Sequence, residues 1–350
     1  MALKPRFFHM YDKEINPQGG LPVKKWSWLC LVILLLIVGL YPLIEQIFKP
    51  FGFVKVKTGE IPVTVKLHDS GKIVTMPLEK YLIGVVAAEM PARFEIEALK
   101  AQAVAARTYA LKKIELRRRG AVTSSMHKDA DLCTNPIHCQ GWLSDKEMKD
   151  KWGLWRYLYY RRKIARAVEA TKGIVITYKG RLIDPVYHST SGGRTENSEE
   201  VWKFKIPYLR SVVCKWDKDA PKYRTKQVYS LHELDRRLGT DVAALPAAAW
   251  KDQRRPVMKV EKFTSSGRVK LLRVGNKLFS GTEVRRLLGL NSTNFSWQVE
   301  GDQIIFTVTG NGHGVGMCQY GANGLAREGK NYQYILTYYY TGVKLEKYNK

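Results

Sequence analysis

The sequence predicts a protein of the α+β class, with a single-pass N-terminal transmembrane helix followed by a mixed domain of short strands and several helices. Three observations predict it: an uncharged apolar stretch near the N-terminus, short runs of alternating apolar and polar residues, and at least four segments with helical periodicity. The chain has 350 residues, of which 45% are hydrophobic and 26% charged. This composition is that of a globular protein with one large or two modest domains.

The apolar stretch runs from Trp26 to Ile44 without a charge, which is long enough to span a bilayer and too long for the core of a signal peptide. The alternative is a buried core helix. Positive residues precede the stretch and place the N-terminus in the cytoplasm; they are Lys4, Arg6, Lys13, Lys24 and Lys25. We therefore expect a cytoplasmic segment at 1–25, a membrane helix at 26–48 and an extracytoplasmic domain at 51–350.

The formal net charge of the chain is +26. A charge of this sign favours contact with a polyanion, such as nucleic acid, an anionic cell wall or an anionic membrane surface. Because we expect the domain to lie outside the cell, the sequence predicts no nucleic-acid partner. An anionic cell wall and an anionic membrane surface remain as the candidate partners.

Short strands and two helices fill the first part of the predicted domain. Alternating residues predict strands within 51–66, and a further strand precedes Pro77, where a helix begins. Pro91 disfavours helix in the residue before it, so this helix is expected to end at or just past Glu89. An alanine-rich helix follows over 95–119, and its small side chains allow a neighbouring element to approach closely.

The rest of the domain alternates between helices and hairpins. The pattern predicts a helix near 154–171, a hairpin within 173–189, and a glycine-rich segment at 311–329 that is followed by a final helix. Residues 222–300 contain two short helical patterns and a hairpin. Whether they form a separate lobe is left open by the sequence.

Glu89 is the one carboxylate in the otherwise apolar run from Tyr81 to Met90. A carboxylate at a helix C-terminus feels the negative end of the helix dipole, and its apolar neighbours add desolvation. Both effects raise its pKa, as a general acid at neutral pH requires. The plain alternative is an exposed glutamate at a helix end.

Glycosidases ordinarily use two carboxylates. The candidates for a second acid are Glu196, Glu199 and Glu200, and none belongs to the segment that contains Glu89. A single acid suits a reaction in which the substrate supplies its own nucleophile. The C6 hydroxyl of a muramic acid residue can do so by attacking C1 to form a 1,6-anhydro ring.

A second candidate site is formed by His127, Cys133, His138 and Cys139. Two histidines and two cysteines within so short a segment make a credible tetrahedral zinc set, although the spacing is not that of a zinc finger. With all four residues bound to zinc, the site would be closed and structural. The alternative is a Cys133–Cys139 disulfide with two incidental histidines.

Two loops are rich in glycine and polar residues. In the first, Gly192 and its neighbours let the backbone approach a ligand closely, and the adjacent hydroxyls can bind sugars. Ser189 follows His188 directly, but no nucleophile-elbow pattern surrounds it, which argues against a serine hydrolase. The glycines of the second loop are too frequent for a packed helix or strand, so we expect it to expose backbone and present His313, Gln319 and Tyr320.

Four blocks in this order resemble the stage II sporulation protein D (SpoIID/LytB) family. They read "AAEMP", "EALKAQAVAARTYAL", "HSTSGGRTE" and "GHGVGMCQYGANGLAREG", and the likeness extends from about residue 60 to 345. The N-terminal membrane anchor also fits this family.

The resemblance implies a lytic transglycosylase that cuts peptidoglycan glycan strands at the MurNAc–GlcNAc bond and leaves 1,6-anhydro-MurNAc ends. Its catalytic acid falls on Glu89, and a zinc set falls on the His/Cys cluster. The substrate-cleft residues of the family map to Gln102, Arg107, Ser189, Ser191 and Gly192. To these we add His313, Gln319 and Tyr320 as further expected substrate-binding residues.

The resemblance also implies a cellular setting. Enzymes of this family act in septal wall remodelling during forespore engulfment, from the mother-cell membrane facing the septal wall. Their expected partners are the stage II sporulation proteins P and M. Two alternatives remain from other functional classes: a zinc-dependent wall amidase, in which the His/Cys cluster is catalytic, and a non-enzymatic glycan-binding module.

Overall fold

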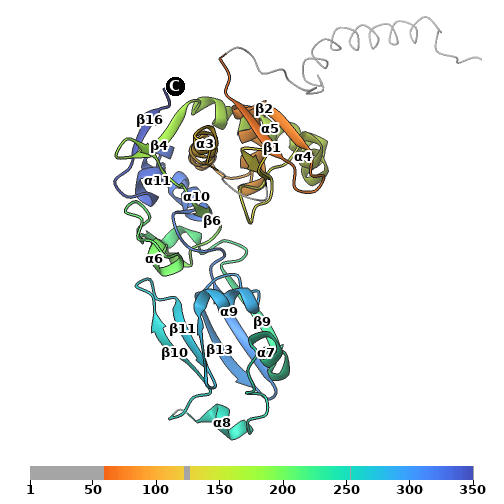
Figure 1. Cartoon of the computed structure of the whole chain (residues 1–350), viewed down its shortest axis with the longest axis vertical. Coiled ribbons are helices and arrows are strands. Elements are labelled where there is room, and N and C mark those ends of the chain that lie inside the picture. Colours follow the sequence, from red (N-terminus) through yellow and green to blue (C-terminus); the bar gives the residue numbers. More distant parts are fainter. Residues whose placement is uncertain (1–58, 122–126, 253, 350) are drawn as a thin grey trace, which may run out of the picture. The chain divides into compact units, whose positions relative to one another are not determined.

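The computed structural model describes residues 59–121, 127–252 and 254–349, which form a mixed α+β structure with short strands, as predicted (Figure 1). The predicted membrane helix at 26–48 lies outside the described residues, as do the expected strands before residue 59. Within the described ranges, no helix has the length and apolar character needed to cross a membrane. The predicted division at 1–25, 26–48 and 51–350 stays a prediction.

A first hydrophobic core unites elements from both ends of the described chain. Its N-terminal elements are β1 (Pro62–Lys66), β2 (Ile73–Pro77), α2 (Leu78–Glu89), α3 (Ile96–Arg118), β3 (Leu132–Cys133), α4 (Asp145–Trp152), α5 (Leu154–Ala170), β4 (Ile174–Tyr178), β5 (Arg181–Leu182), β6 (Tyr187–His188), β7 (Gly193–Arg194), α6 (Ser198–Val201) and β8 (Val213–Cys214). Its C-terminal elements are β15 (Met317–Cys318), α10 (Gln319–Arg327), α11 (Tyr332–Tyr339) and β16 (Lys344–Lys347).

Helix α3 is the centre of this first core. It packs against α2, α5, α10 and α11, and its alanines at 98, 101, 103, 105, 106 and 110 are fully buried. Because alanine side chains are short, several helices can approach the α3 backbone at once. The close-approach role predicted for these residues is confirmed.

The end of α2 is set by Pro91, as predicted. Met90 leaves the helix with φ −122° and ψ 139°, the extended conformation that a following proline favours. Glu89 is therefore the last helical residue, and Met90 itself is buried. Helix α3 then begins at Ile96 and returns beside α2.

A second hydrophobic core is built between β8 and β15 of the chain, from residues that lie between Tyr229 and Val308. The 3-10 helix η2 (Lys215–Asp217) packs against α10 of the first core. The elements of the second core are β9 (Arg224–Ser230), α7 (Leu231–Leu238), α8 (Ala247–Lys251), β10 (Met258–Phe263), β11 (Val269–Val274), β12 (Lys277–Ser280), α9 (Gly281–Leu287), β13 (Phe295–Glu300) and β14 (Gln303–Thr309). They make two antiparallel sheets, ordered β10-β11-β12 and β13-β14-β9, with α7 and α9 packed beside them (Figure 1).

The C-terminal glycine-rich segment differs from its prediction. Part of it is helix α10, which contains Gly321 and Gly324. A Cβ atom on Gly321 would lie 2.1 Å from the Tyr339 hydroxyl, and one on Gly324 would lie 2.1 Å from Cβ of Trp216. These glycines are therefore needed for close packing of a helix, and the expected continuous loop is limited to residues 310–316.

Candidate active site and metal centre

Glu89 lies where two cavities meet. The first has a volume of about 580 Å³ and the second about 640 Å³, and Ala88 and Glu89 line both of them. The first is bounded by the α2–α3 turn, helices α4 and α5, and the start of α10. The second is bounded by the loop after β1 and the chain from Thr134 to Glu147. A long substrate can thus extend to both sides of the Glu89 carboxyl.

The carboxyl of Glu89 is held by one backbone hydrogen bond. The N–H of Gly141 donates to its Oε1 at 2.5 Å, and a Cβ on Gly141 would crowd the same oxygen at 3.1 Å. Burial raises the pKa of Glu89 from 4.5 to about 7, while the Gly141 hydrogen bond acts in the opposite direction. The raised pKa predicted from the sequence is confirmed, and its main physical cause is desolvation.

Two predicted residues position the backbone of Glu89. The amide nitrogen of Gln319 donates to the Glu89 carbonyl oxygen at 2.9 Å and to Oε1 of Gln102 at 3.3 Å. Gln319 also lines the first cavity, whereas Gln102 is fully buried on α3. The C-terminal glycine-rich block and the alanine-rich helix therefore meet at the end of α2.

Tyr320 and Ser189 are the other predicted residues that line the first cavity. The Tyr320 ring packs edge-on against Phe94 with ring centroids 4.9 Å apart. The carbonyl oxygen of Ser189 accepts a hydrogen bond from the Tyr320 N–H at 3.1 Å. The two glycine-rich blocks thus share one wall of the cavity.

Arg107 does not line either cavity. It is fully buried on α3, where its guanidinium donates to both carboxylate oxygens of Glu79 at 2.9 and 2.6 Å. It also donates to the carbonyl oxygens of Val168 and Ile174. Arg107 joins α2 to the end of α5 and the start of β4. The substrate contact expected for it is therefore not found in this structure.

Ser191, Gly192 and His313 also lie away from both cavities. The amides of Ser191 and Gly192 and the Ser191 hydroxyl all donate to Oδ2 of Asp217, at 2.6, 2.9 and 2.7 Å. His313 lies 3.0 Å through Nε2 from the Tyr187 carbonyl oxygen, and burial lowers its pKa to about 4. These residues fix the shape of the glycine-rich loops behind the cavity wall.

The candidates for a second acid are engaged elsewhere. Glu196 is buried beside Arg268 and accepts a hydrogen bond from Thr264. Glu199 pairs with Arg210 and Glu200 with Lys270, each at 2.5 Å. None of the three lines a cavity that contains Glu89.

Several cavity residues were not singled out from the sequence. In the first cavity they are aromatic or basic: Arg93, Lys151, Trp152, Arg156, Tyr160 and Lys222. In the second cavity they include Trp142 and two carboxylates, Asp69 and Glu147. Most of the first group belongs to the run "KWGLWRYLYYRR" at 151–162, whose mixture of aromatic and basic residues was an available signal for glycan binding.

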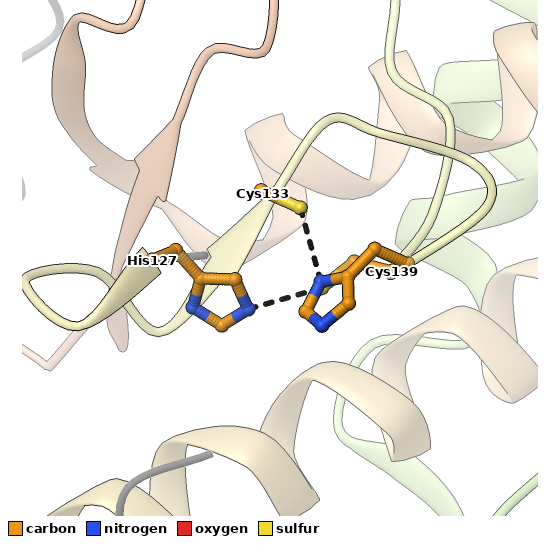
Figure 2. Close-up of side chains that lie close together, drawn as sticks. His127, Cys133 and Cys139 are labelled. Atoms are coloured by element: carbon orange, nitrogen blue, oxygen red, sulfur yellow. Dashed lines mark hydrogen bonds between the residues drawn. The ribbon is translucent and has the colours of Figure 1, made fainter. Parts of the chain in front are cut away.

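The four predicted metal ligands converge in the loop around β3. One ligand atom from each of His127, Cys133, His138 and Cys139 lies within 4.8 Å of all the others. The Cys139 sulfur is 3.3 Å from Nε2 of His127 and 3.3 Å from Nδ1 of His138, and the Cys133 sulfur is 3.4 Å from that same Nδ1. Figure 2 shows the His127 ring and the two thiols turned toward one another.

The chemistry and surroundings of this cluster fit Zn²⁺. Two nitrogens and two sulfurs form a tetrahedral donor set that suits zinc, and both cysteines are free thiols. Nδ1 of His127 lies 3.1 Å from the Ala130 carbonyl oxygen, which leaves Nε2 to face the sulfurs. With four protein ligands the site would be closed. Gly141, whose N–H binds Glu89, lies two residues after Cys139 in the chain.

Known proteins of one family are similar to this chain over most of its length. The family model described as stage II sporulation protein matches residues 67–178, which include Glu89, Gly141 and the His/Cys cluster. Stage II sporulation protein D of Bacillus subtilis is 37% identical over 297 residues, covering 85% of this chain and 82% of that protein. The protein of the same name from Bacillus amyloliquefaciens is 38% identical, covering 82% of this chain and 80% of its own length.

A more distant relative is the amidase enhancer of Bacillus subtilis, which is 30% identical over 318 residues. The match covers 76% of this chain but only 40% of that longer protein. The extent of the two Bacillus matches, together with the family model, decides the assignment: the chain belongs to the stage II sporulation protein D family.

Proposed function

We propose that this sporulation protein is a lytic transglycosylase that cleaves peptidoglycan glycan strands. The observation that carries the proposal is the Glu89 carboxyl, which sits between two cavities with a pKa raised to about 7. At neutral pH a large fraction of this carboxyl is protonated. It can therefore donate a proton to the glycosidic oxygen that leaves as the bond breaks.

The second half of the reaction uses the same residue. Once Glu89 has given up its proton, the carboxylate accepts the proton of the C6 hydroxyl, whose oxygen attacks C1 of the muramic acid ring. The products are a 1,6-anhydro end and a strand with a new free hydroxyl, and no water is consumed. Gly141 holds the carboxyl oxygen and Gln319 holds the Glu89 backbone, so that one group can serve both steps.

The walls of the first cavity suit a glycan substrate. Trp152 and Tyr160 provide aromatic surface for the apolar faces of sugar rings. Arg93, Lys151 and Arg156 add positive charge, which favours a strand that carries carboxylates. These residues come from α4, α5 and the α2–α3 turn, which are packed together in the first core.

We propose that the His/Cys cluster binds one structural zinc ion. The bound ion would cross-link the loop at 127–139 through its four ligands. In this role, His127, Cys133, His138 and Cys139 hold the chain that presents the Gly141 N–H to Glu89. A catalytic zinc of an amidase would need an open coordination position, and four protein ligands leave none.

The cellular setting is part of the same proposal. The segment at 26–48 would anchor the protein in the mother-cell membrane, with the N-terminus in the cytoplasm and the catalytic domain facing the septal wall. There it would act during engulfment with the stage II sporulation proteins P and M, on glycan strands and without nucleic acid. Support comes from the family membership and the net charge of +26.

The decisive experiment compares three variants acting on purified cell wall, with soluble products identified by mass spectrometry. Glu89→Gln is expected to reduce release of anhydro-muropeptides by at least about 100-fold, the usual contribution of a general acid. Asp69→Asn and Glu147→Gln, the matched controls within the second cavity, are expected to retain most of it. Products with ordinary reducing ends, or an equal loss in a control, would reveal a two-carboxylate hydrolase.

The same experiment separates the alternatives. An amidase would release stem peptides from muramic acid without cutting the strand. A binding module would release nothing from purified wall in the wild-type form, and Glu89→Gln would leave its wall affinity unchanged.

A further inference from the structure

A second cluster of sulfur and carboxylate groups lies outside the proposed mechanism. Cys214, Asp217 and Cys318 are all fully buried, and one ligand atom from each lies within 4.8 Å of the other two. Both cysteines are free thiols in this structure. They come from positions roughly 100 residues apart in the chain.

Each thiol lies at the end of a strand that supports the cavity wall. Cys214 ends β8, which pairs with β7 of the first glycine-rich loop. Cys318 ends β15 and caps α10, where its sulfur accepts a hydrogen bond from the Gly321 N–H at 3.4 Å. A Cβ atom on Gly321 would lie 2.4 Å from the Cys214 sulfur, so this glycine keeps open the space in which the two thiols meet.

The pair is chemically asymmetric. A hydrogen bond from Cys318 lowers the pKa of the Cys214 thiol, whereas burial raises that of Cys318. Cys214 is therefore the thiol more easily converted to the thiolate that attacks a disulfide.

Asp217 already has other partners. Its Oδ2 accepts three hydrogen bonds from Ser191 and Gly192, at 2.6, 2.7 and 2.9 Å. Its Oδ1 has no partner among the described residues, and a metal ion bound to the two thiols would use this oxygen. Such a site would have three protein ligands in a closed pocket, one fewer than a structural zinc site ordinarily has. A covalent bond between the sulfurs needs no further ligand. It removes the hydrogen bond that the Cys318 thiol donates to Oδ2 of Asp217 at 3.5 Å, and it keeps the three hydrogen bonds from Ser191 and Gly192.

We propose that Cys214 and Cys318 form a disulfide in the working protein. The Cys214 thiolate attacks a sulfur of a low-molecular-weight disulfide, and one thiol leaves. The Cys318 thiolate then attacks the mixed disulfide and expels the second thiol. Two protein thiols lose two protons and two electrons, and the external disulfide is reduced to two thiols. Because both sulfurs are buried, exchange occurs during folding or in transient openings of the native state.

The position of this bond gives it a structural consequence. Residues 214 and 318 lie on the two connections through which the chain enters and leaves the second core, which spans Tyr229 to Val308. The disulfide would close a loop of roughly 100 residues around that core, and long loops give the largest predicted stabilisation. It would also restrain the backbone at Cys318, which directly precedes Gln319, the residue that binds the Glu89 carbonyl.

The test uses the full-length chain, purified in detergent with zinc present and equilibrated for a day with oxidised glutathione. After acid quenching, free thiols are alkylated and peptides are mapped by mass spectrometry with and without reduction. We expect one cross-linked peptide pair that joins Cys214 to Cys318. We also expect the thermal midpoint of the oxidised chain to exceed that of the reduced chain by about 5–10 °C.

The double variant Cys214→Ser with Cys318→Ser is the control, and its thermal midpoint should not respond to glutathione. If this variant does not fold, the comparison of the oxidised with the reduced wild-type chain still tests the proposal. Complete alkylation of both thiols before reduction, or glutathione adducts without a cross-link, would overturn the proposal. The proposal would also be overturned if a chelator made both thiols accessible to alkylation and the chain bound a second zinc ion. That result would identify a metal site.

Discussion

Replacing Glu89 by glutamine should stabilise the protein at alkaline pH while removing the proposed glycan-cleaving activity. The carboxyl has a pKa raised from 4.5 to about 7, which means that the folded environment disfavours its ionised form. At pH 8 the wild-type group is ionised in both the folded and the unfolded states. The fold then carries a penalty of roughly 3 kcal/mol from this one group.

The sign of the pH dependence follows from the direction of the shift. As pH falls from about 7 to 4.5, the folded state takes up a proton while the unfolded state is still ionised, so stability rises. Below that range both states are protonated and the penalty is absent. Glutamine resembles the neutral acid in shape and still offers an oxygen to the Gly141 N–H. It therefore lacks the penalty at every pH.

The assay is thermal unfolding of the wild type and Glu89→Gln at pH 8 and at pH 4.5. We expect the variant to unfold about 5 °C higher than the wild type at pH 8 and at nearly the same temperature at pH 4.5. A variant that is less stable than the wild type at pH 8 would refute the reasoning. It would mean that the ionised carboxylate is well accommodated and that Glu89 is not a protonated acid near neutrality.

Two further outcomes are expected. Arg107→Met, which leaves Glu79 without its buried partner, should lower the free energy of unfolding by about 3–5 kcal/mol in denaturant titrations, while the products released by the remaining folded protein keep their anhydro ends. Retained stability with altered products would instead place Arg107 in the substrate cleft. If the His/Cys cluster binds zinc as proposed, a chelator should lower the thermal midpoint, with recovery on adding one zinc ion per chain. Activity lost to the chelator without any change in stability would point to a catalytic metal.

The local features of the site were predictable from the sequence. Pro91 set the end of α2, and the apolar neighbours of Glu89 predicted its raised pKa. The short spacing of the His/Cys cluster was enough to predict that its four side chains converge. In each case the relevant contacts come from residues close in the chain or from general burial.

The predictions that were wrong concern residues whose contacts come from distant segments of the chain. Arg107 lies on the same helix as Gln102, and nothing local indicates that it faces Glu79 instead of the cavity. The glycines of α10 resemble loop glycines until Tyr339 and Trp216 are seen packed against them. A high glycine content signals close backbone approach, and only the tertiary structure decides whether a ligand or another helix makes that approach.

The geometry around Glu89 suggests why its site is distributed over the whole chain. A carboxyl that must release a proton and then take one up has to keep its position in both charge states. Gly141 fixes its side chain and Gln319 its backbone, and each lies next to a sulfur-containing cluster in the chain. The His/Cys cluster precedes Gly141 by two residues, and Cys318 directly precedes Gln319. If zinc binds the first cluster and a disulfide forms in the second, both supports of Glu89 are held by bonds stronger than ordinary packing. Loss of either cluster should then shift the pH profile of cleavage, since Glu89 would gain freedom to reach water.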